Sequence, residues 1–457
     1  MTNNIKTTIQ EALETRILVV DGAMGTSIQS LDLTAEDFGG PEYEGCNEYL
    51  SLTNPNAISL IHEQYLQAGA DIIETNTFGA TSVVLAEYDL QHLTMEINLT
   101  SAKLARDMVD KYSTPQRPRY VAGSMGPTTK TISLTGGISF EELTESYKEQ
   151  AHGLIQGNVD FLLLETCQDT INIKAGVNGI REAIEESGVN VPIAIQGTIE
   201  PMGTLLAGQD IEALYTSLQH LDLLWIGLNC ATGPSFMSDH IRQLAEFSKF
   251  PIACIPNAGL PDEDGNYNET PDMFSTTVKG FADNGWLNVV GGCCGTGPEH
   301  ISKLSSTISN VTPREPVFKT ETRVSGIEAL LIDDDSKPII VGERTNVLGS
   351  RRFKRLIAEE ALEEASEIGR RQIRNGAHIL DVCLQDPDRD ELSDIKSYLQ
   401  LLTKKTKAPI MIDSTDSTVI KESLKMLQGK SIINSINLED GESRFAEIIP
   451  LVHQYGA

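Results

Sequence analysis

The sequence predicts an α/β protein in which a (β/α)8 barrel of the TIM type is followed by the first part of a second (β/α) barrel. Three observations predict this fold. Short runs rich in Val, Ile and Leu alternate with longer amphipathic stretches, eight of these runs precede residue 310, and each run ends in polar residues or glycine. Such continuous apolar runs are typical of parallel strands that helices bury on both faces.

The first barrel is expected over residues 1–310. Its eight strands are RILVVDG, DIIETNTF, YVAGSMGP, FLLLETC, PIAIQGT, LLWIGLNC, PIACIPNAG and NVVGGCCGT. In this fold the carboxyl ends of the strands meet at one rim, which carries the chemistry. The residues expected at that rim are polar or carry a thiol, and they are Asp21, Glu74, Asn76, Ser124, Glu165, Gln196, Asn229, Cys230, Asn257, Cys293 and Cys294.

A linker is expected over residues 311–337, because this stretch is polar and has no sustained helical period. We expect one short strand within it. A second series then follows over residues 338–457, with the four apolar runs PIIVGERTN, AHILDVC, APIMIDST and SIINSINL. Four strands make half a barrel, whose open edges and unclosed core natural proteins seldom leave bare. We therefore interpret the chain as a truncated product or as one that another chain completes.

The bulk composition restricts the class of partner. The 457 residues carry a net charge of −29, with 65 acidic and 36 basic residues, which argues against nucleic acids and anionic membranes. The N-terminus lacks the basic start and apolar core of a signal peptide, and there is no apolar stretch of about 20 residues. We predict a cytoplasmic protein in which Cys46, Cys167, Cys254 and Cys383 are reduced and structural.

Three other cysteines predict a metal site. Cys230 ends one expected strand, and Cys293 and Cys294 follow another. Free cysteines also pack as small apolar side chains, which is the alternative for each of them alone. However, adjacent strand residues point to opposite faces, so Cys293 and Cys294 cannot both enter one core. The pair is therefore expected where the strand opens into a loop, and the sequence predicts a zinc site with three thiolate ligands.

A zinc ion with three protein ligands keeps a fourth position open, which is typical of a catalytic site. A substrate thiol that binds there loses its proton. The metal and three thiolates sum to a charge of −1, so the incoming sulfur keeps much of its electron density and stays nucleophilic. A hydrolase more often uses nitrogen and oxygen ligands to polarise water. The three cysteines therefore favour alkyl transfer to a thiol.

Other residues at the rim suggest an amino-acid site. The first expected strand is followed by Asp21 and by a turn suited to a substrate carboxylate or to a simple strand-to-helix connection, made of Gly22, Ala23, Met24, Gly25 and Thr26. Glu165 is placed to pair with a substrate ammonium, to cap a helix or to hold a loop. Asn257 in PNAG is placed to touch the metal or the substrate.

The motifs DGAMGT, ETNTF, GSMGP, LLLET, GLNC, PNAG and GGCCGT together resemble the zinc-dependent homocysteine S-methyltransferase family. The resemblance covers residues up to about 310 and implies that Cys230, Cys293 and Cys294 bind Zn²⁺. It also implies that homocysteine sulfur takes the open position, that Asp21, Glu165 and the Gly22–Thr26 turn hold the amino-acid end, and that methionine is the product. We expect an oxygen of Asn257 to occupy the metal when the substrate is absent.

The remaining chain resembles the pterin-binding barrel of cobalamin-dependent methionine synthases. The resemblance rests on GERTN, GSRRF, LDV, IDS and QGKSIINSI, and the expected pterin contacts are Glu343, Asn346, Asp381, Asp413 and Asn434. A pterin offers an amide-like edge that Asp and Asn at strand ends can pair. Taken singly, Asp413 could cap a helix and Asn434 could satisfy a loop backbone.

This second resemblance implies a relay in which 5-methyltetrahydrofolate methylates cobalamin, and methylcobalamin methylates homocysteine. We expect the cobalamin-binding module to lie outside these residues, in the same chain or in a partner. Two alternatives stay open: a homocysteine S-methyltransferase that uses a simple donor such as S-methylmethionine or betaine, and a non-catalytic fragment that binds only homocysteine and zinc. No role is assigned to the histidines, including His62, His240 and His300.

Overall fold

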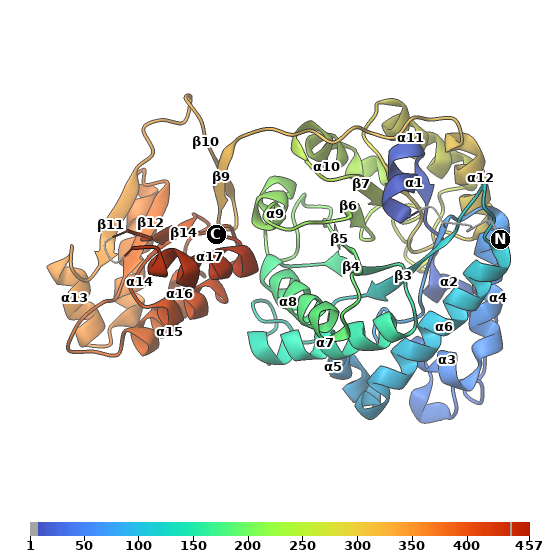
Figure 1. The fold of residues 1–457 in the computed structure, drawn as a ribbon, viewed down its shortest axis with the longest axis horizontal. Coiled ribbons are helices and arrows are strands. Elements are labelled where there is room, and N and C mark those ends of the chain that lie inside the picture. The colour runs from blue at the N-terminus through green and yellow to red at the C-terminus, as the bar shows by residue number, and fades with distance from the viewer. Residues whose placement is uncertain (1–7, 439–440) are drawn as a thin grey trace. The chain divides into compact units, whose positions relative to one another are not determined.

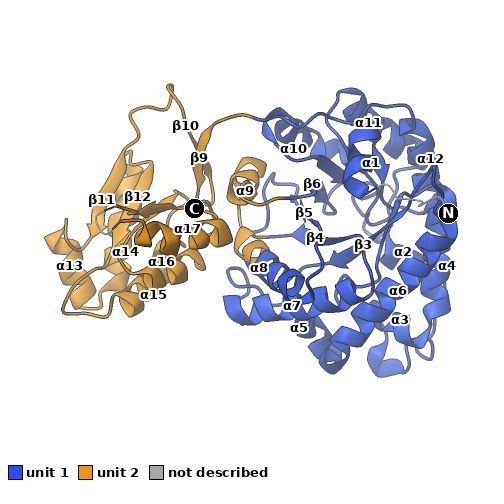
Figure 2. Ribbon diagram, in the orientation of Figure 1, with its two compact units in different colours: residues 1–168, 175–206, 223–318 blue, residues 169–174, 207–222, 319–457 orange. Residues whose placement is uncertain are grey.

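The computed structural model describes residues 8–438 and 441–457 (Figure 1). The chain forms two compact units (Figure 2), the first made of residues 1–168, 175–206 and 223–318 and the second of residues 169–174, 207–222 and 319–457. Because both units are discontinuous in sequence, the domain limits predicted at residues 310 and 338 stay predictions.

The first unit contains a barrel of eight parallel strands, as the sequence predicts. The strands follow the order β1-β8-β7-β6-β5-β4-β3-β2. Leu18 of β1 pairs with Val289 of β8, and a bridge between Val20 and Ile72 closes the remaining gap. The strands are β1 (Leu18–Val19), β2 (Ile72–Glu74), β3 (Tyr120–Met125), β4 (Phe161–Cys167), β5 (Ile193–Gly197), β6 (Trp225–Asn229), β7 (Ile252–Ile255) and β8 (Val289–Val290).

Helices surround the strands of this barrel (Figure 1). Their ends follow local signals: Asn54 caps α4, which ends at Gly69 in a left-handed conformation, and Ser139 and Glu142 form a capping box at α7. The helices of residues 8–310 are α1 (Ile9–Thr15), α2 (Met24–Gln29), α3 (Leu50–Thr53), α4 (Pro55–Ala68), α5 (Ser82–Leu85), α6 (Thr94–Tyr112), α7 (Phe140–Gln156), α8 (Thr170–Ser187), α9 (Ile211–Leu218), α10 (Pro234–Phe247), α11 (Pro271–Asp283) and α12 (Pro298–Ile308).

The barrel interior is packed at the end opposite the C-terminal rim. Phe161 and Trp225 meet edge to face, with ring centroids 4.8 Å apart. Ile9 and Leu13 of α1 belong to the same buried cluster, so α1 helps to fill this end of the barrel. The apolar residues therefore close the floor, and the opposite rim is left for polar side chains.

The predicted linker contains a β-hairpin, which corrects the expectation of one short strand. In place of one short strand, β9 (Thr322–Ser325) and β10 (Ala329–Ile332) form an antiparallel hairpin. Gly326 stands in the turn, where an added Cβ would lie 2.4 Å from the carbonyl oxygen of Lys407. The sequence signal for this pair is weak, because the segment has polar flanks and its apolar run, Ala329–Ile332, is short.

The four strands predicted for the remaining chain are confirmed as a parallel sheet in the order β11-β12-β13-β14. The strands are β11 (Val341–Asn346), β12 (Ile379–Cys383), β13 (Ile410–Asp413) and β14 (Ile432–Asn434). The connecting helices are α13 (Arg351–Ala358), α14 (Leu362–Arg374), α15 (Glu391–Leu402), α16 (Ser417–Leu424) and α17 (Ser443–Tyr455).

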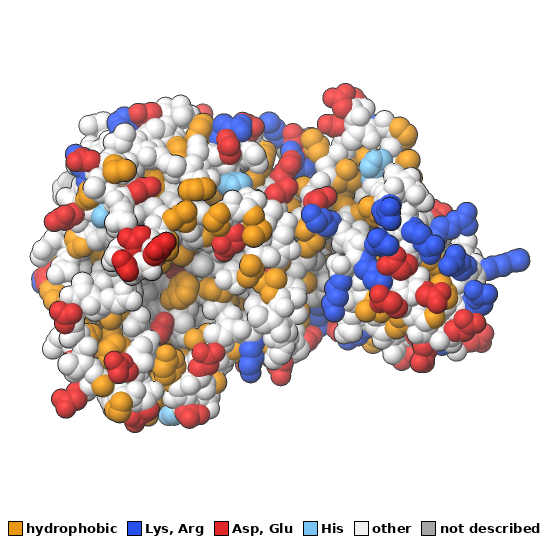
Figure 3. All heavy atoms as spheres, turned by 180° about the vertical axis from the view of Figure 1, so that it is seen from behind, with side chains coloured by type: hydrophobic (Ala, Val, Ile, Leu, Met, Phe, Trp, Pro, Cys, Tyr) orange, Lys and Arg blue, Asp and Glu red, His pale blue; other side chains and the backbone are white. Residues whose placement is uncertain are grey.

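Basic residues are concentrated in the second unit. Twenty of the 36 Lys and Arg residues of the sequence fall within residues 319–457. The face in Figure 3 shows blue side chains gathered over this unit, and four basic residues of α13 are exposed, namely Arg351, Arg352, Lys354 and Arg355. Among the described residues, no helix is long and apolar enough to cross a bilayer.

Candidate active site

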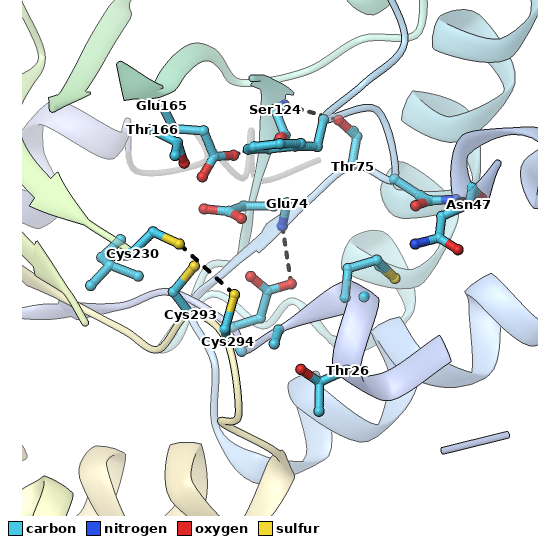
Figure 4. Close-up of a pocket in the computed structure, with 18 of the residues that line it drawn as sticks. Thr26, Asn47, Glu74, Thr75, Ser124, Glu165, Thr166, Cys230, Cys293 and Cys294 are labelled. Atoms are coloured by element: carbon cyan, nitrogen blue, oxygen red, sulfur yellow. Dashed lines mark hydrogen bonds between the residues drawn. The ribbon is translucent and has the colours of Figure 1, made fainter. Parts of the chain in front are cut away.

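Three cysteines meet at the C-terminal rim of the barrel. Cys230 follows β6, and Cys293 and Cys294 lie in the loop after β8. Their Sγ atoms all lie within 4.8 Å of one another, and those of Cys230 and Cys294 are 3.8 Å apart (Figure 4). Cys230 has a φ of 60°, a left-handed conformation that is costly for a residue with a Cβ and that turns the chain sharply. The three thiols therefore converge as the sequence predicts.

This set of donors fits zinc. Two thiolates about 2.3 Å from a tetrahedral zinc ion are roughly 3.8 Å apart, which matches the distance between Cys230 and Cys294. Thiolate ligands favour zinc over hard cations such as Mg²⁺. The other four cysteines are buried and, within the part of the chain that the structure describes, form no disulfide; they are Cys46, Cys167, Cys254 and Cys383.

Hydrogen bonds within the cluster shift the pKa values of Cys293 and Cys294 in opposite directions. Side-chain hydrogen bonds with Cys230 and Cys293 lower the pKa of Cys294 to about 3. The contacts with Cys230 and Cys294 raise the pKa of Cys293 well above its ordinary value. Tyr267, from the loop before α11, adds a side-chain hydrogen bond to Cys294. Hydrogen bonding within the cluster therefore favours the ionised form of Cys294, and Tyr267 is a neighbour for which the sequence gives no signal.

The cysteines open onto a cavity of about 220 Å³. Its wall carries four carboxyl groups and, among the described residues that line it, no Lys, Arg or His. The lining comprises Asp21, Gly22, Ala23, Met24, Gly25, Thr26, Asn47, Glu48, Glu74, Thr75, Asn76, Thr77, Phe78, Ser124, Glu165, Thr166, Cys230, Ile255, Gly292, Cys293 and Cys294. Such a cavity favours a ligand that carries positive charge.

Glu165 lies near the end of β4 and is held by side chains of β3 and β6. Ser124 Oγ donates to its Oε1 at 2.6 Å, and Asn229 Nδ2 donates to its Oε2 at 3.0 Å. Burial raises the pKa of Glu165 to about 7. The hydrogen-bond partners of its carboxyl group are thus strand side chains and not the N–H groups of a helix or a loop. The group faces the cavity beside the cysteines (Figure 4).

Asp21 and the turn that follows it form another part of the cavity wall. Asp21 Oδ2 accepts a hydrogen bond from the backbone N–H of Glu74 at 3.1 Å, whereas its buried Oδ1 has no partner. Burial raises the pKa of Asp21 well above its ordinary value. Gly22 is required by close packing, because an added Cβ would lie 2.7 Å from Tyr65 Cε1 and 2.9 Å from the carbonyl oxygen of Thr296.

Glu74 ends β2 and Asn257 follows β7, but only Glu74 lines the cavity. Glu74, at the end of β2, lines the cavity, although the sequence analysis gave it no role. Asn257 is buried and its Oδ1 has no partner, but it is not among the residues that line the cavity. Its backbone N–H donates to the carbonyl oxygen of Thr232 at 3.0 Å. A contact of Asn257 with metal or substrate therefore stays a prediction.

The expected pterin contacts come together at the carboxyl ends of β11 to β14. Asn346 Nδ2 donates to Asp381 Oδ2 at 2.9 Å and to Asp413 Oδ2 at 3.1 Å. Asn434 also hydrogen-bonds to the side chain of Asp381. Burial raises the pKa of both carboxyl groups, and Glu343 lies near enough to raise them further. The five residues therefore form one acidic cluster.

Comparison with known families decides between the possible classes. The sequence profile of the homocysteine S-methyltransferases matches residues 18–308. The chain belongs to the homocysteine S-methyltransferase family. The profile of the pterin binding enzymes matches residues 342–457, which include all five members of the acidic cluster.

One relative matches nearly the whole of this homocysteine S-methyltransferase chain. The methionine synthase of Mycobacterium tuberculosis is 40% identical over 458 residues, which make up 99% of this chain and 38% of that protein. The chain thus spans well under half the length of that relative, of which it is a homologue.

Two solved structures share the fold of this family member. The metallated form of the homocysteine methyltransferase MmuM from Escherichia coli superposes with a TM-score of 0.53 at 21% identity, covering 64% of this chain and 96% of that one. The oxidised form of the same enzyme gives a TM-score of 0.51 at 21% identity, with 64% and 95% covered. At this identity the likeness shows the fold alone.

Proposed function

We propose that the first barrel binds homocysteine as the acceptor of a methyl group and that the product is methionine. The observation that carries this proposal is the cluster of Cys230, Cys293 and Cys294 beside a cavity with four carboxyl groups. Homocysteine carries a thiol for the metal position and an ammonium group for the carboxylates. The family membership supports the same substrate.

We propose a partner for each charged group at the amino-acid end of the substrate. Asp21 and Glu165 are proposed to receive the ammonium group, since both are buried and face the same cavity. The turn from Gly22 to Thr26 is proposed to receive the carboxylate through its backbone N–H groups, because no side chain caps α2. Thr26 Oγ1 accepts a hydrogen bond from the backbone of Gly295 at 3.2 Å, which ties this turn to the loop of Cys293 and Cys294.

Cys230, Cys293 and Cys294 are proposed to hold Zn²⁺, which when bound would act as a Lewis acid that favours the thiolate form of the substrate. Backbone hydrogen bonds of the protein hold two of these cysteines in position. Cys230 is held by its backbone N–H, which donates to Ile255 at 3.1 Å, and that of Cys293 donates to Pro256 at 2.8 Å. We propose that Asn257, next to Pro256, contacts the metal in the absence of substrate, which its unpartnered Oδ1 supports.

The second unit is proposed to bind 5-methyltetrahydrofolate. The pterin-binding profile and the cluster of Asn346, Asp381 and Asp413 support this ligand. The nitrogen that releases the methyl group leaves as an anion unless it is protonated, and acidic or amide groups near it stabilise the protonated form. The exposed basic residues of α13 follow the strand of Asn346, and they suit the anionic glutamate portion of a folate.

We further propose that cobalamin, carried on a module outside residues 1–457, links the folate to homocysteine. The match to a methionine synthase supports this donor. A homocysteine methyltransferase that uses S-methylmethionine or betaine would need no pterin-binding region, so the match over residues 342–457 disfavours it.

Methionine formation from homocysteine tests the choice of donor. The purified chain loaded with zinc is incubated with homocysteine and either methylcobalamin, S-methylmethionine or betaine. The proposal predicts methionine with methylcobalamin and none with the other two donors. Methionine formed only with S-methylmethionine or betaine would support the simple-donor enzyme, and homocysteine binding without methionine from any donor would support the non-catalytic fragment.

A further inference from the structure

Three carboxyl groups lie close together at one side of the cavity, one more than the two assigned above. Asp21 follows β1, Glu74 is the last residue of β2, and Glu165 lies in β4. Glu74 is close enough to Glu165 and Asp21 for both to raise its pKa. Figure 4 shows the Glu74 carboxyl group directed into the space between Glu165 and the cysteines. A cation in this space would therefore meet Glu74 as well as the other two acids.

The three acids differ in how far the protein already uses their oxygens. Both oxygens of Glu165 accept a hydrogen bond from a fixed donor, Ser124 or Asn229. One oxygen of Asp21 accepts a bond from the backbone of Glu74, and the other has no partner. Among the described residues, none donates a hydrogen bond to the carboxyl group of Glu74. The acceptors left open for a ligand are therefore Asp21 Oδ1 and the carboxyl group of Glu74.

We propose that Glu74 is a substrate-binding residue that, together with Asp21, receives the ammonium group of homocysteine and makes the site selective for amino thiols. This inference rests on the proposed function. An ammonium group has three N–H donors, and a carboxylate that accepts one of them forms a charge-assisted hydrogen bond. Glu165, whose two oxygens already accept hydrogen bonds, then adds its charge beside the ammonium group, while Asp21 and Glu74 provide the open acceptors.

The backbone contact between the two acids supports this pairing. Because the N–H of Glu74 donates to Asp21 Oδ2, the end of β2 is held next to Asp21. The next residue, Thr75, is fixed as well, since its Oγ1 accepts from the backbone N–H of Ser124 at 3.0 Å and contacts Thr77 Oγ1 at 2.6 Å. The side chain of Glu74 therefore extends into the cavity from a rigid strand end.

The test compares two thiols on two zinc-loaded proteins. Homocysteine and 4-sulfanylbutanoate differ only in the amino group, and binding of each is measured by calorimetry to the wild-type chain and to the Glu74→Gln variant. The proposal predicts that Glu74→Gln weakens homocysteine binding by roughly 10- to 100-fold, as for one charge-assisted hydrogen bond. The binding of 4-sulfanylbutanoate is expected to stay within about twofold.

Glu149→Gln provides a matched control, because Glu149 is a half-buried carboxyl group of α7 in the same barrel and is not among the residues that line the cavity. It is expected to leave the preference for homocysteine unchanged. The proposal is overturned if Glu74→Gln weakens both thiols equally or neither. Loss of zinc from Glu74→Gln would also overturn it, since Glu74 would then serve the metal cluster. If the wild-type chain binds neither thiol, the proposed function itself fails.

Discussion

The side-chain amide of Asn229 joins a buried carboxyl group to the cysteine cluster. Its Nδ2 donates to Glu165 Oε2 at 3.0 Å, and the next residue in the chain is Cys230. Asn229 also bonds the backbone N–H and the Oγ1 of Thr166, whose φ of 53° is unusual for a β-branched residue. One side chain therefore fixes both a proposed substrate contact and the strand end that carries a proposed zinc ligand.

Replacing Asn229 with alanine should disrupt the site more than the fold. We expect homocysteine binding to weaken by about tenfold or more and the free energy of unfolding to fall by roughly 2 kcal/mol, since buried partners lose their hydrogen bonds. Calorimetry and denaturant unfolding measure the two effects. Asn288→Ala is the control, because Asn288 is equally buried and hydrogen-bonded but lies directly before β8. Equal loss of binding in both variants would contradict the account.

The stability of the metal-free protein should depend on pH through Glu165. Its pKa is raised from 4.5 to about 7 by burial, so between these values the folded state holds a proton that the unfolded state has released. The free energy of unfolding should therefore fall as pH rises from about 5 to 7, by up to about 3 kcal/mol from this residue. Urea unfolding across this range should show a smaller decrease for Glu165→Gln. An unchanged pH dependence in that variant would contradict the assignment.

The glycine after Asp21 should not tolerate a side chain. Gly22→Ala would place a Cβ 2.7 Å from Tyr65 and 2.9 Å from the carbonyl oxygen of Thr296. We expect a loss of about 1–3 kcal/mol in the free energy of unfolding and weaker homocysteine binding. In α11, Gly280 has no heavy atom within 4 Å of an added Cβ, so Gly280→Ala should be neutral or stabilising. Thermal unfolding with the same midpoint for both variants would contradict this packing argument.

The acidic cluster of the second unit should bind folate independently of the thiol site. Asn346→Ala removes the amide that bridges Asp381 and Asp413, and we expect 5-methyltetrahydrofolate to bind about tenfold more weakly. Homocysteine binding and zinc content should not change. Asn375→Ala, at an exposed position after α14, serves as the control for folate binding. Folate affinity that is unaffected by Asn346→Ala would argue against this ligand site.

Much of the site could be predicted from the sequence because parallel strands deliver their end residues to one rim. That rule placed Asp21, Glu165 and the three cysteines correctly without any contact information. It could not assign a role to Glu74, since the ability of a carboxyl group to bind a ligand depends on which of its oxygens already accept hydrogen bonds within the protein. The left-handed backbone at Thr166 and Cys230 and the bond from Tyr267 to Cys294 arise from tertiary packing, which leaves no local pattern.

The fold was predictable to a similar extent. Continuous apolar runs indicated all twelve parallel strands. The hairpin of β9 and β10 was not predicted, because its two strands are short and mix polar with apolar residues. Their pairing also depends on contact across a turn at Gly326.

Zinc analysis of the purified chain tests the central claim most directly. The account predicts about one zinc ion per wild-type chain, held by Cys230, Cys293 and Cys294. The double variant with Cys293 and Cys294 changed to Ala should lose the metal and its binding of homocysteine. Cys254→Ala, which removes a buried thiol of β7, should keep both. Wild-type protein that is free of zinc after purification without chelators, or a double variant that retains zinc, would contradict the account.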